Sequence, residues 1–264
     1  MNTIKKSLHI FLHFLQRDLL ILRPMLSRYI INNVMILPCL VIFNDGYVMQ
    51  MSLFGTNANL NTMRFIGSLL LPLLTLTFTM ATTLLYDIEH NRFIDYQITV
   101  LNPALVILER IVFNAFFTFM LVVPFYPLCK VLLGTKFVTT QTSWSLLFVM
   151  LFLASFTASA YHIAAMCILP NSSMFIRLWA RVSAPLFLLG GFVAPWAVMY
   201  EISPTVAYVL LLNPFMYISE GIRQSIIGGT FFFSAMTCVS ALILFCIFLY
   251  GVALWFFKKR MDHV

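Results

Sequence analysis

Charged side chains are scarce in this chain, yet several of them gather in residues 86–110. This stretch holds six charged residues and one histidine between long apolar runs: Asp87, Glu89, His90, Arg92, Asp95, Glu109 and Arg110. Charged groups are costly to place in lipid, so we expect the stretch to lie in water, within reach of another molecule. A solvated loop is the simpler interpretation. The apolar side formed by Ile94, Ile98 and Leu101 favours a helical docking element instead.

Two further sets of polar residues lie within apolar sequence. Glu220 and Arg223 are three positions apart, a spacing that brings side chains together on a helix. A local ion pair is the simpler interpretation, and a gate or substrate contact is the alternative, because intramembrane charges are usually functional. His162 stands alone in a long apolar run. A hydrogen bond between helices is favoured over a proton relay, since no intramembrane acid has a matching position.

No pattern in the sequence points to catalysis or to a bound cofactor. It contains no P-loop, GxGxxG, HExxH or GxSxG motif. His9 and His13 are four positions apart, but a metal site needs further ligands and none is near. The cysteines stand singly in apolar runs, which is typical of small buried side chains: Cys39, Cys129, Cys167, Cys238 and Cys246. We therefore expect no catalytic residue, no metal ligand and no cofactor site in this chain.

The composition places the chain in a membrane. Of its 264 residues, 61% are hydrophobic and 9% are charged, whereas soluble domains carry about 25% charged residues. A soluble fold has no way to hide so much apolar surface, because its exterior must stay wet. Spanning takes roughly 20 apolar residues per helix, so the chain has room for six spans and little else. We expect residues 1–264 to form one transmembrane domain.

The expected fold class is an all-α membrane protein with six transmembrane helices. The first four and the last are expected over residues 28–51, 65–86, 106–133, 144–169 and 231–257. The fifth starts near Phe175 and is interrupted by Pro185, Gly190-Gly191 and Pro195. The pieces within residues 196–229 are too short to cross a bilayer. They are expected to form re-entrant or interfacial helices before the last span.

Residues 1–23 form a predicted amphipathic helix that lies in the membrane interface. Apolar residues recur along it with the period of a helix: Ile4, Leu8, Phe11, Leu15, Leu19 and Leu22. Basic and polar residues, Arg17 among them, take the opposite arc. Asp18 breaks the pattern because it falls within the apolar arc. A buried carboxylate needs a partner, so we expect Asp18 to pair with a basic residue of the bundle.

Lysine and arginine set the orientation, because they concentrate in cytoplasmic loops. With both termini in the cytoplasm, 12 of the 16 lysines and arginines fall on the inner side. This bias explains the net charge of +7 without a nucleic-acid partner. It also places residues 86–110 in the cytoplasm, and it predicts a multi-pass protein of the cell inner membrane.

This pattern resembles the membrane subunits, or permeases, of ABC-2 type ABC transporters. One shared feature is an amphipathic N-terminal helix with Arg17-Asp18 before the first span. Another is a charged segment between the second and third spans, here residues 87–92, followed by a short helix and Asn102-Pro103. The family often has a glycine where this chain has Phe93. The most specific is the segment before the last span: Pro185, Gly190-Gly191-Phe192, Pro195, Pro204, residues 212–217 and Glu220-Gly221-Ile222-Arg223.

The resemblance implies a subunit of an ATP-driven exporter that is not an enzyme by itself. ATP and Mg would bind two copies of a separate cytoplasmic ABC ATPase. A second copy of this chain, or a related permease, would complete the path through the lipid bilayer. The cargo would be amphiphilic, lipid-linked, a polysaccharide or drug-like.

The resemblance also assigns roles to particular residues. Within a coupling segment, residues 86–105, the ATPase would contact Asp87, Glu89, Arg92, Phe93, Ile94, Asp95 and Tyr96. Arg17 and Asp18 would belong to an interface helix that also touches the ATPase. Within residues 196–229 and just before them, an outer gate or substrate path would involve Gly190, Gly191, Pro195, Glu220 and Arg223.

Two other classes of function remain open. An ion-gradient-driven secondary transporter needs ion ligands at the middle of the membrane, often within inverted repeats. Here four of the nine acids cluster in the expected cytoplasmic connection, and no two halves of the sequence repeat visibly. An intramembrane enzyme or a structural membrane protein is the third class, and no nucleophile–base pair supports an enzyme.

Overall fold

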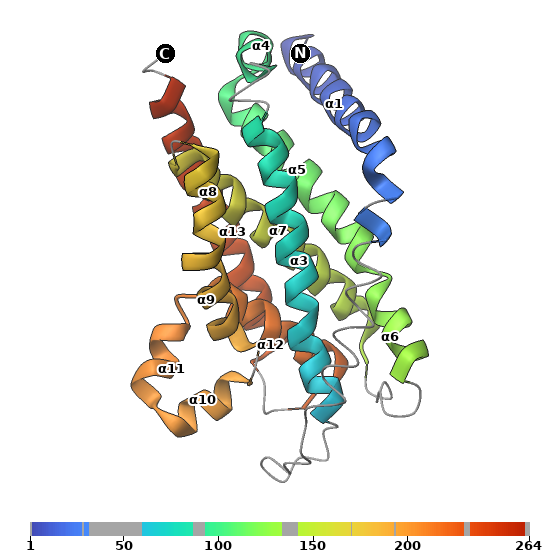
Figure 1. Ribbon diagram of the computed structural model, residues 1–264, viewed down its shortest axis with the longest axis vertical. Coiled ribbons are helices and arrows are strands. Elements are labelled where there is room, and N and C mark those ends of the chain that lie inside the picture. Colours follow the sequence, from blue (N-terminus) through green and yellow to red (C-terminus); the bar gives the residue numbers. More distant parts are fainter. Residues whose placement is uncertain are drawn as a thin grey trace.

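The computed structural model describes residues 2–27, 29–31, 60–86, 93–133, 142–169, 171–192, 194–229 and 233–261. Within these ranges the secondary structure is helical, and no strand occurs (Figure 1). The all-α class expected from the sequence is therefore confirmed for the part of the chain that is described.

One helix, α7 (Trp144–Ile168), lies at the centre of the bundle. It packs against α3 (Leu60–Tyr86), α5 (Pro103–Val122), α12 (Pro214–Ile226) and α13 (Ala235–Met261) (Figure 1). Small residues allow this close approach on several sides: Ala154, Ser155, Ala158, Ser159 and Ala160 are all buried along α7. The sequence of α7 is apolar around most of its circumference, which suits a helix surrounded by others.

Among the described residues, four segments are long and apolar enough to cross a membrane: Pro103–Leu128, Trp144–Ile168, Ser172–Phe192 and Ala235–Arg260. A fifth is obtained if the bent pair Pro204–Leu210 and Pro214–Ile226 counts as one span. Six spans are thus not confirmed. Most of the expected first span, residues 28–51, lies outside the described residues, and the apolar section recognised within α3 is Leu70–Thr82.

The N-terminal helix α1 (Asn2–Leu22) packs along α5. It runs into a short 3-10 turn, η1 (Arg23–Met25), where Pro24 fits the start of a new turn. Phe14, Asp18 and Leu22 are buried, and their spacing of four places them on one face. Leu8 and Leu19, expected on the same apolar arc as Leu22, are 58% and 50% exposed. Some apolar residues of α1 therefore pack against the bundle, while others on the same helix remain exposed.

The two Asn-Pro pairs begin helices, as the sequence predicts. Asn102 Oδ1 accepts the Ala104 N–H at 2.9 Å, and Asn213 Oδ1 accepts the Phe215 N–H at 3.1 Å. Proline follows each asparagine at the first helical position, where its missing N–H is not needed. Ahead of the first pair, the predicted short helix is present as α4 (Phe93–Val100).

The segment Ser172–Phe192, which we call the fifth candidate span because it is the fifth expected from the sequence, is a series of short helical pieces. It comprises α8 (Ser172–Leu178), the π-helical turn η4 (Trp179–Ser183), α9 (Ala184–Phe187) and the π-helical turn η5 (Leu188–Phe192). The helix continues through Pro185, which lies in the first turn of α9. The interruption expected at Pro185 is therefore absent, whereas the one expected at the glycine pair is present, where Gly191 takes a left-handed φ of 85°.

Short helices fill the chain between that break and the last span. They are α10 (Trp196–Ile202), α11 (Pro204–Leu210) and α12, and the axes of α11 and α12 differ by 95°. Helix α12 stops before Gly228 and Gly229, whose φ angles of 72° and 92° favour glycine. The expected run of short helices is confirmed.

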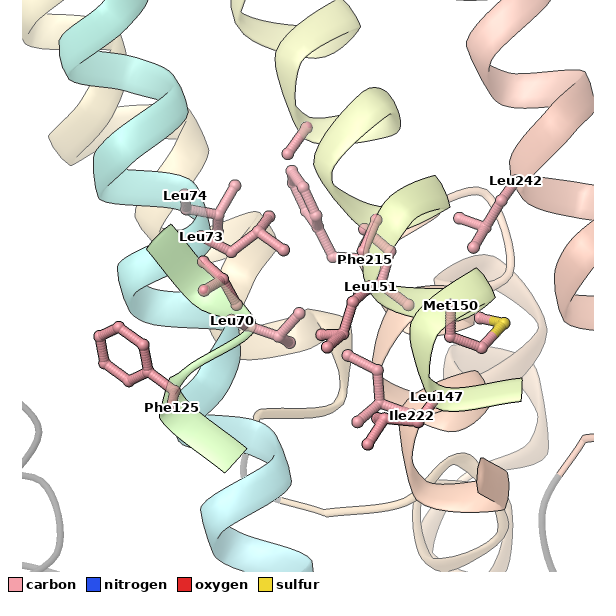
Figure 2. Packing of buried hydrophobic residues seen from close by; sticks show 14 of the residues in the cluster. Leu70, Leu73, Leu74, Phe125, Leu147, Met150, Leu151, Phe215, Ile222 and Leu242 are labelled. Atoms are coloured by element: carbon pink, nitrogen blue, oxygen red, sulfur yellow. The ribbon is translucent and has the colours of Figure 1, made fainter. Parts of the chain in front are cut away.

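The main core joins α12 to the bundle. Leucines of α3 meet Leu147, Met150 and Leu151 of α7 and Phe215 and Ile222 of α12, with Leu242 of α13 on the side of Met150 (Figure 2). The α12 end of the molecule also carries α10 and α11, while α4, the start of α1 and the end of α13 lie at the opposite end (Figure 1). The molecule therefore has two distinct ends, and the polar contacts described below lie at both.

Candidate functional site: two buried ionic clusters

A buried guanidinium joins three elements at the α4 end. Arg110 of α5 donates from Nη1 to Asp18 Oδ2 of α1 at 2.7 Å. Its Nη2 donates to Gln97 Oε1 of α4 at 2.8 Å. Glu109 Oε2 lies 3.2 Å from Arg110 Nε, and Arg17 Nη1 lies 3.2 Å from Asp18 Oδ1. We call these five residues the inner cluster, and the corresponding set at the other end the outer cluster, after the sides of the membrane expected from the sequence. All except Arg17 are buried, so their charges interact with one another and not with water.

The inner cluster confirms one expectation and corrects another. Asp18 pairs with a basic residue of the bundle, as its position on the apolar arc predicts. Glu109 and Arg110, expected to lie in water with the rest of residues 86–110, are buried within α5 instead. They can be buried because each charge has a partner of opposite sign nearby. Gln97 was not singled out from the sequence, although it shares a helix side with Ile94, Ile98 and Leu101.

The residues expected to contact an ATPase are only partly described. Asp87, Glu89 and Arg92 lie outside the described residues. Phe93, Ile94, Asp95 and Tyr96 form the first turn of α4. This helix contacts α5, and through Gln97 it reaches the inner cluster. The expected docking helix is therefore attached directly to the candidate span that follows it.

A second buried ion pair lies in α12. Arg223 Nη1 and Glu220 Oε1 are 3.1 Å apart, and both side chains are 1% exposed. Arg223 Nη2 also donates to the Gly191 carbonyl, and Glu220 Oε1 accepts the Trp196 N–H at 3.1 Å. We call Gly190, Gly191, Trp196, Ser219, Glu220 and Arg223 the outer cluster. The ion pair expected from the i,i+3 spacing is confirmed, and it ties α12 to the end of η5 and the start of α10.

The structure brings together the residues expected at an outer gate. Ser219 Oγ donates to the Gly190 carbonyl at 2.8 Å, next to the Gly191–Arg223 contact. Pro195 is buried and directly precedes Trp196, whose N–H bonds to Glu220. Sequence reasoning missed Ser219 and Trp196. Ser219 lies between the prolines and glycines that drew attention, and a backbone donor such as the Trp196 N–H leaves no signature in a sequence.

Close packing requires both glycines of this break. A Cβ added to Gly190 would lie 2.5 Å from Phe215 Cβ, and one added to Gly191 would collide with Ser219 Oγ. Gly191 also has a φ of 85°, which side chains disfavour. Side chains of α12 therefore contact the backbone of η5 directly.

We expect Gly191→Ala to reduce the free energy of unfolding by about 2–5 kcal/mol, because the left-handed φ costs about 1–2 kcal/mol and the collision about 1–3 kcal/mol. Gly229→Ala is the matched control, since Gly229 has a φ of 92° but open space around its Cα. The Gly229→Ala variant should lose only the contribution of the left-handed φ, about 1–2 kcal/mol. Thermal unfolding in detergent measures both. Equal losses in the two variants would show that the contact with Ser219 contributes nothing.

A polar connection inside the bundle links α3, α5 and α7. His162 Nδ1 lies 2.9 Å from Thr77 Oγ1, and Asn114 Nδ2 donates to the Thr77 carbonyl at 3.0 Å. The hydrogen bond between helices that we favoured for His162 is confirmed. The rings of Phe78 and Trp179 flank this histidine. Asn114 was not singled out from the sequence, where one asparagine among many apolar residues gives little signal.

The described residues contain no group of three potential metal ligands. His9 and His13 meet edge-to-face on the exposed side of α1, with their Nε2 atoms 3.0 Å apart. The two ionic clusters can hold helices together and transmit displacements between them. Neither presents a nucleophile beside a base. Comparisons with protein-family models, with curated proteins and with solved structures find no match to this chain.

Proposed function

We propose that this chain is the membrane subunit of an ATP-driven exporter of the ABC-2 type, built from six spans. The observation that carries the proposal is the inner cluster. In a transporter powered from outside the membrane, a docking helix must be joined to the spans that it moves. Gln97 of α4 and Asp18 of α1 both bond to Arg110 of α5, so all three helices share one guanidinium.

A displacement of α4 is then transmitted to the bundle through its contacts with α5. Buried polar contacts are costly to break, so α4, α1 and α5 move together. Helix α5 packs on α7, and α7 packs on α12. At the other end, α12 is tied to the broken η5 segment by the outer cluster. Small shifts of packed helices can in this way switch a path between inward-open and outward-open states.

The partners follow from what this sequence lacks. It has no P-loop, so ATP hydrolysis and Mg belong to a separate cytoplasmic ATPase in two copies. In this proposal Phe93, Ile94 and Tyr96 anchor α4 on the ATPase, while Asp95 and the charges of residues 87–92 set the register. A second copy of this chain, or a related permease, completes the path.

The proposed location is the cell inner membrane, with both termini in the cytoplasm. Two observations support this orientation. The bias of lysine and arginine favours that side for the termini and for residues 86–110. The start of α1, helix α4 and the end of α13, which carries Lys258, Lys259 and Arg260, lie at one end of the molecule (Figure 1).

Purification from the native host in mild detergent tests the proposal, with an affinity tag on this chain alone. We expect a cytoplasmic ATPase to be recovered with the wild type. Substituting Phe93, Asp95 and Tyr96 together with alanine should reduce that recovery without reducing membrane insertion, because these residues form the first turn of α4. The matched control substitutes Val206, Tyr208 and Val209 of α11, three exposed residues at the other end.

The control triple variant should recover as much ATPase as the wild type. Equal recovery by the α4 variant would show that α4 is not the docking helix. A purified chain that transports in liposomes without ATP would contradict the exporter proposal itself.

A further inference from the structure

Two arginines lie within the fifth candidate span. Arg177 and Arg181 are four positions apart in Ser172–Phe192, and both are exposed. Residues four apart lie on the same side of a helix, with Cβ atoms roughly 5–6 Å from each other. The residues next to them, Ile176 and Val182, are also exposed and apolar. The exposed side of this segment therefore carries two arginines next to exposed apolar residues.

The inward side of the same segment fixes this orientation. Phe175, Trp179 and Ser183 recur every four residues and point into the bundle. Phe175 and Trp179 contact the ring of Phe78 with centroid distances of 4.7 and 5.1 Å, and Ser183 Oγ lies 3.1 Å from Tyr161 Oη. Residues two positions away from these anchors must face outward. The arginines are thus held away from the bundle by packing.

The two arginines differ from the buried arginines of this chain. Arg110 and Arg223 each pair with a carboxylate, and so does Arg17 at the edge of the inner cluster. In the part of the chain that the structure describes, no carboxylate pairs with Arg177 or Arg181. Arg181 lies nine positions inside its span, roughly 13 Å at 1.5 Å per residue. Charges at such positions usually face a ligand, a partner or a wet path.

The backbone around Arg181 is also unusual. Residues Trp179–Ser183 form the π-helical turn η4 inside an otherwise α-helical stretch. Single π turns within α-helices are found frequently at functional sites. This observation is independent of the exposure of the arginines, and it concerns a turn that contains Arg181.

We propose that Arg177 and Arg181 form a binding site for the phosphate group of an amphiphile. Two guanidinium groups on one helix side can share the acceptor oxygens of a single phosphoryl or diphosphoryl group. The exposed Ile176 and Val182 would contact its hydrocarbon part. The inference builds on the proposed exporter, and it narrows the cargo to amphiphiles that carry phosphate. Neutral or cationic compounds would gain nothing from this site.

Lipid retention by the purified full chain tests the site without any ATPase. The chain is immobilised in a neutral detergent and offered radiolabelled phosphatidic acid, farnesyl diphosphate or, as a lipid without phosphate, diacylglycerol. The wild type should retain one phosphate-bearing lipid per chain in preference to diacylglycerol. Replacing both arginines with glutamine should weaken this retention about 25-fold, because each cation near a lipid phosphate contributes about fivefold.

Lys258→Gln with Lys259→Gln is the matched control, since it removes two exposed positive charges elsewhere, at the end of α13. Its retention should equal that of the wild type. Salt gives a second measurement: sodium chloride should weaken retention by the wild type and leave the residual retention of the arginine variant unchanged. The inference is overturned if both double variants lose retention equally, or if the wild type retains diacylglycerol as well as phosphatidic acid.

Competition between phosphatidic acid and farnesyl diphosphate shows which of two kinds of ligand, a bilayer phospholipid or a lipid-linked cargo, the site prefers. Tighter binding of farnesyl diphosphate supports a lipid-linked cargo, and equal binding supports the headgroup of a bilayer phospholipid. Failure of the exporter proposal is distinguishable, because it would appear as missing ATPase with lipid retention intact.

Discussion

Replacing Arg110 with methionine should release α1 and α4 from the bundle and reduce the free energy of unfolding by about 3–5 kcal/mol, the usual cost of removing one partner of a buried ion pair. The substitution leaves Asp18 and Gln97 buried without the guanidinium that both contact. Methionine fills a similar volume, so the loss reports on charge and hydrogen bonding more than on a cavity. Thermal unfolding in detergent measures the change.

Arg17→Met is the matched control for this prediction. Arg17 also pairs with Asp18, but its side chain is 30% exposed whereas that of Arg110 is 7% exposed. A pair open to water contributes at most about 1 kcal/mol, so the control should be close to the wild type. Comparable losses in both variants would contradict the central role of Arg110.

A double variant separates charge from packing. Asp18→Leu combined with Arg110→Met replaces the pair by apolar side chains, which is often neutral or stabilising. It should therefore recover part of the loss, although Glu109 stays behind in the cluster. ATPase recovery should remain low in this variant if α4 needs its bond to Arg110 for docking, and it should return if the bond serves stability alone.

The second large effect is expected at the outer cluster. Arg223→Met leaves the Glu220 carboxylate without its cation, and this side chain is 1% exposed. Glu220→Leu leaves the Arg223 guanidinium, which is equally buried, without its carboxylate. Each single variant should lose about 3–5 kcal/mol of unfolding free energy. Glu220→Leu also removes the acceptor for the Trp196 N–H, so α10 should loosen in that variant alone.

A double-mutant cycle gives the strength of the pair, and we expect an interaction of about 1–3 kcal/mol. Glu201→Gln in α10 is the control, because Glu201 is exposed and its loss should change stability by less than about 0.5 kcal/mol. Additive losses in the double variant would show that Glu220 and Arg223 do not stabilise each other.

The same double variant distinguishes the two interpretations of this pair. If Glu220 and Arg223 only hold α12 in place, the apolar double variant should regain both stability and transport. If they line an outer gate or contact cargo, it should regain stability and still fail to transport. The measurement is ATP-driven uptake into inverted membrane vesicles, normalised to the amount of folded protein.

Local signals in the sequence predicted some parts of this fold well. Asn102 and Asn213 each combine a side-chain acceptor with a following proline, and both begin a helix as expected. The i,i+3 spacing of Glu220 and Arg223 predicted their contact, because helix geometry alone brings such residues together. The burial of Asp18 followed from its place on an apolar arc.

Contacts between residues that are distant in the sequence could not be predicted in the same way. Periodicity showed that Asp18 needs a cation, but the identity of Arg110 depends on how α1 lies along α5. Glu109 and Arg110 looked like part of a solvated stretch, since hydropathy treats each charge separately and ignores a partner from another helix. The outward side of Arg177 and Arg181 depends on ring contacts to Phe78, which no local pattern contains.

The contact between Asp18 and Arg110 also constrains the order of events during biosynthesis. The two residues are 92 positions apart. At synthesis rates of about 5–20 residues per second, α1 leaves the ribosome roughly 5–20 seconds before its partner on α5. During that interval Asp18 has no guanidinium from the bundle to neutralise it, so α1 must wait at the membrane surface. Its docking is therefore expected to be a late step, which completes only after α5 has entered the bilayer.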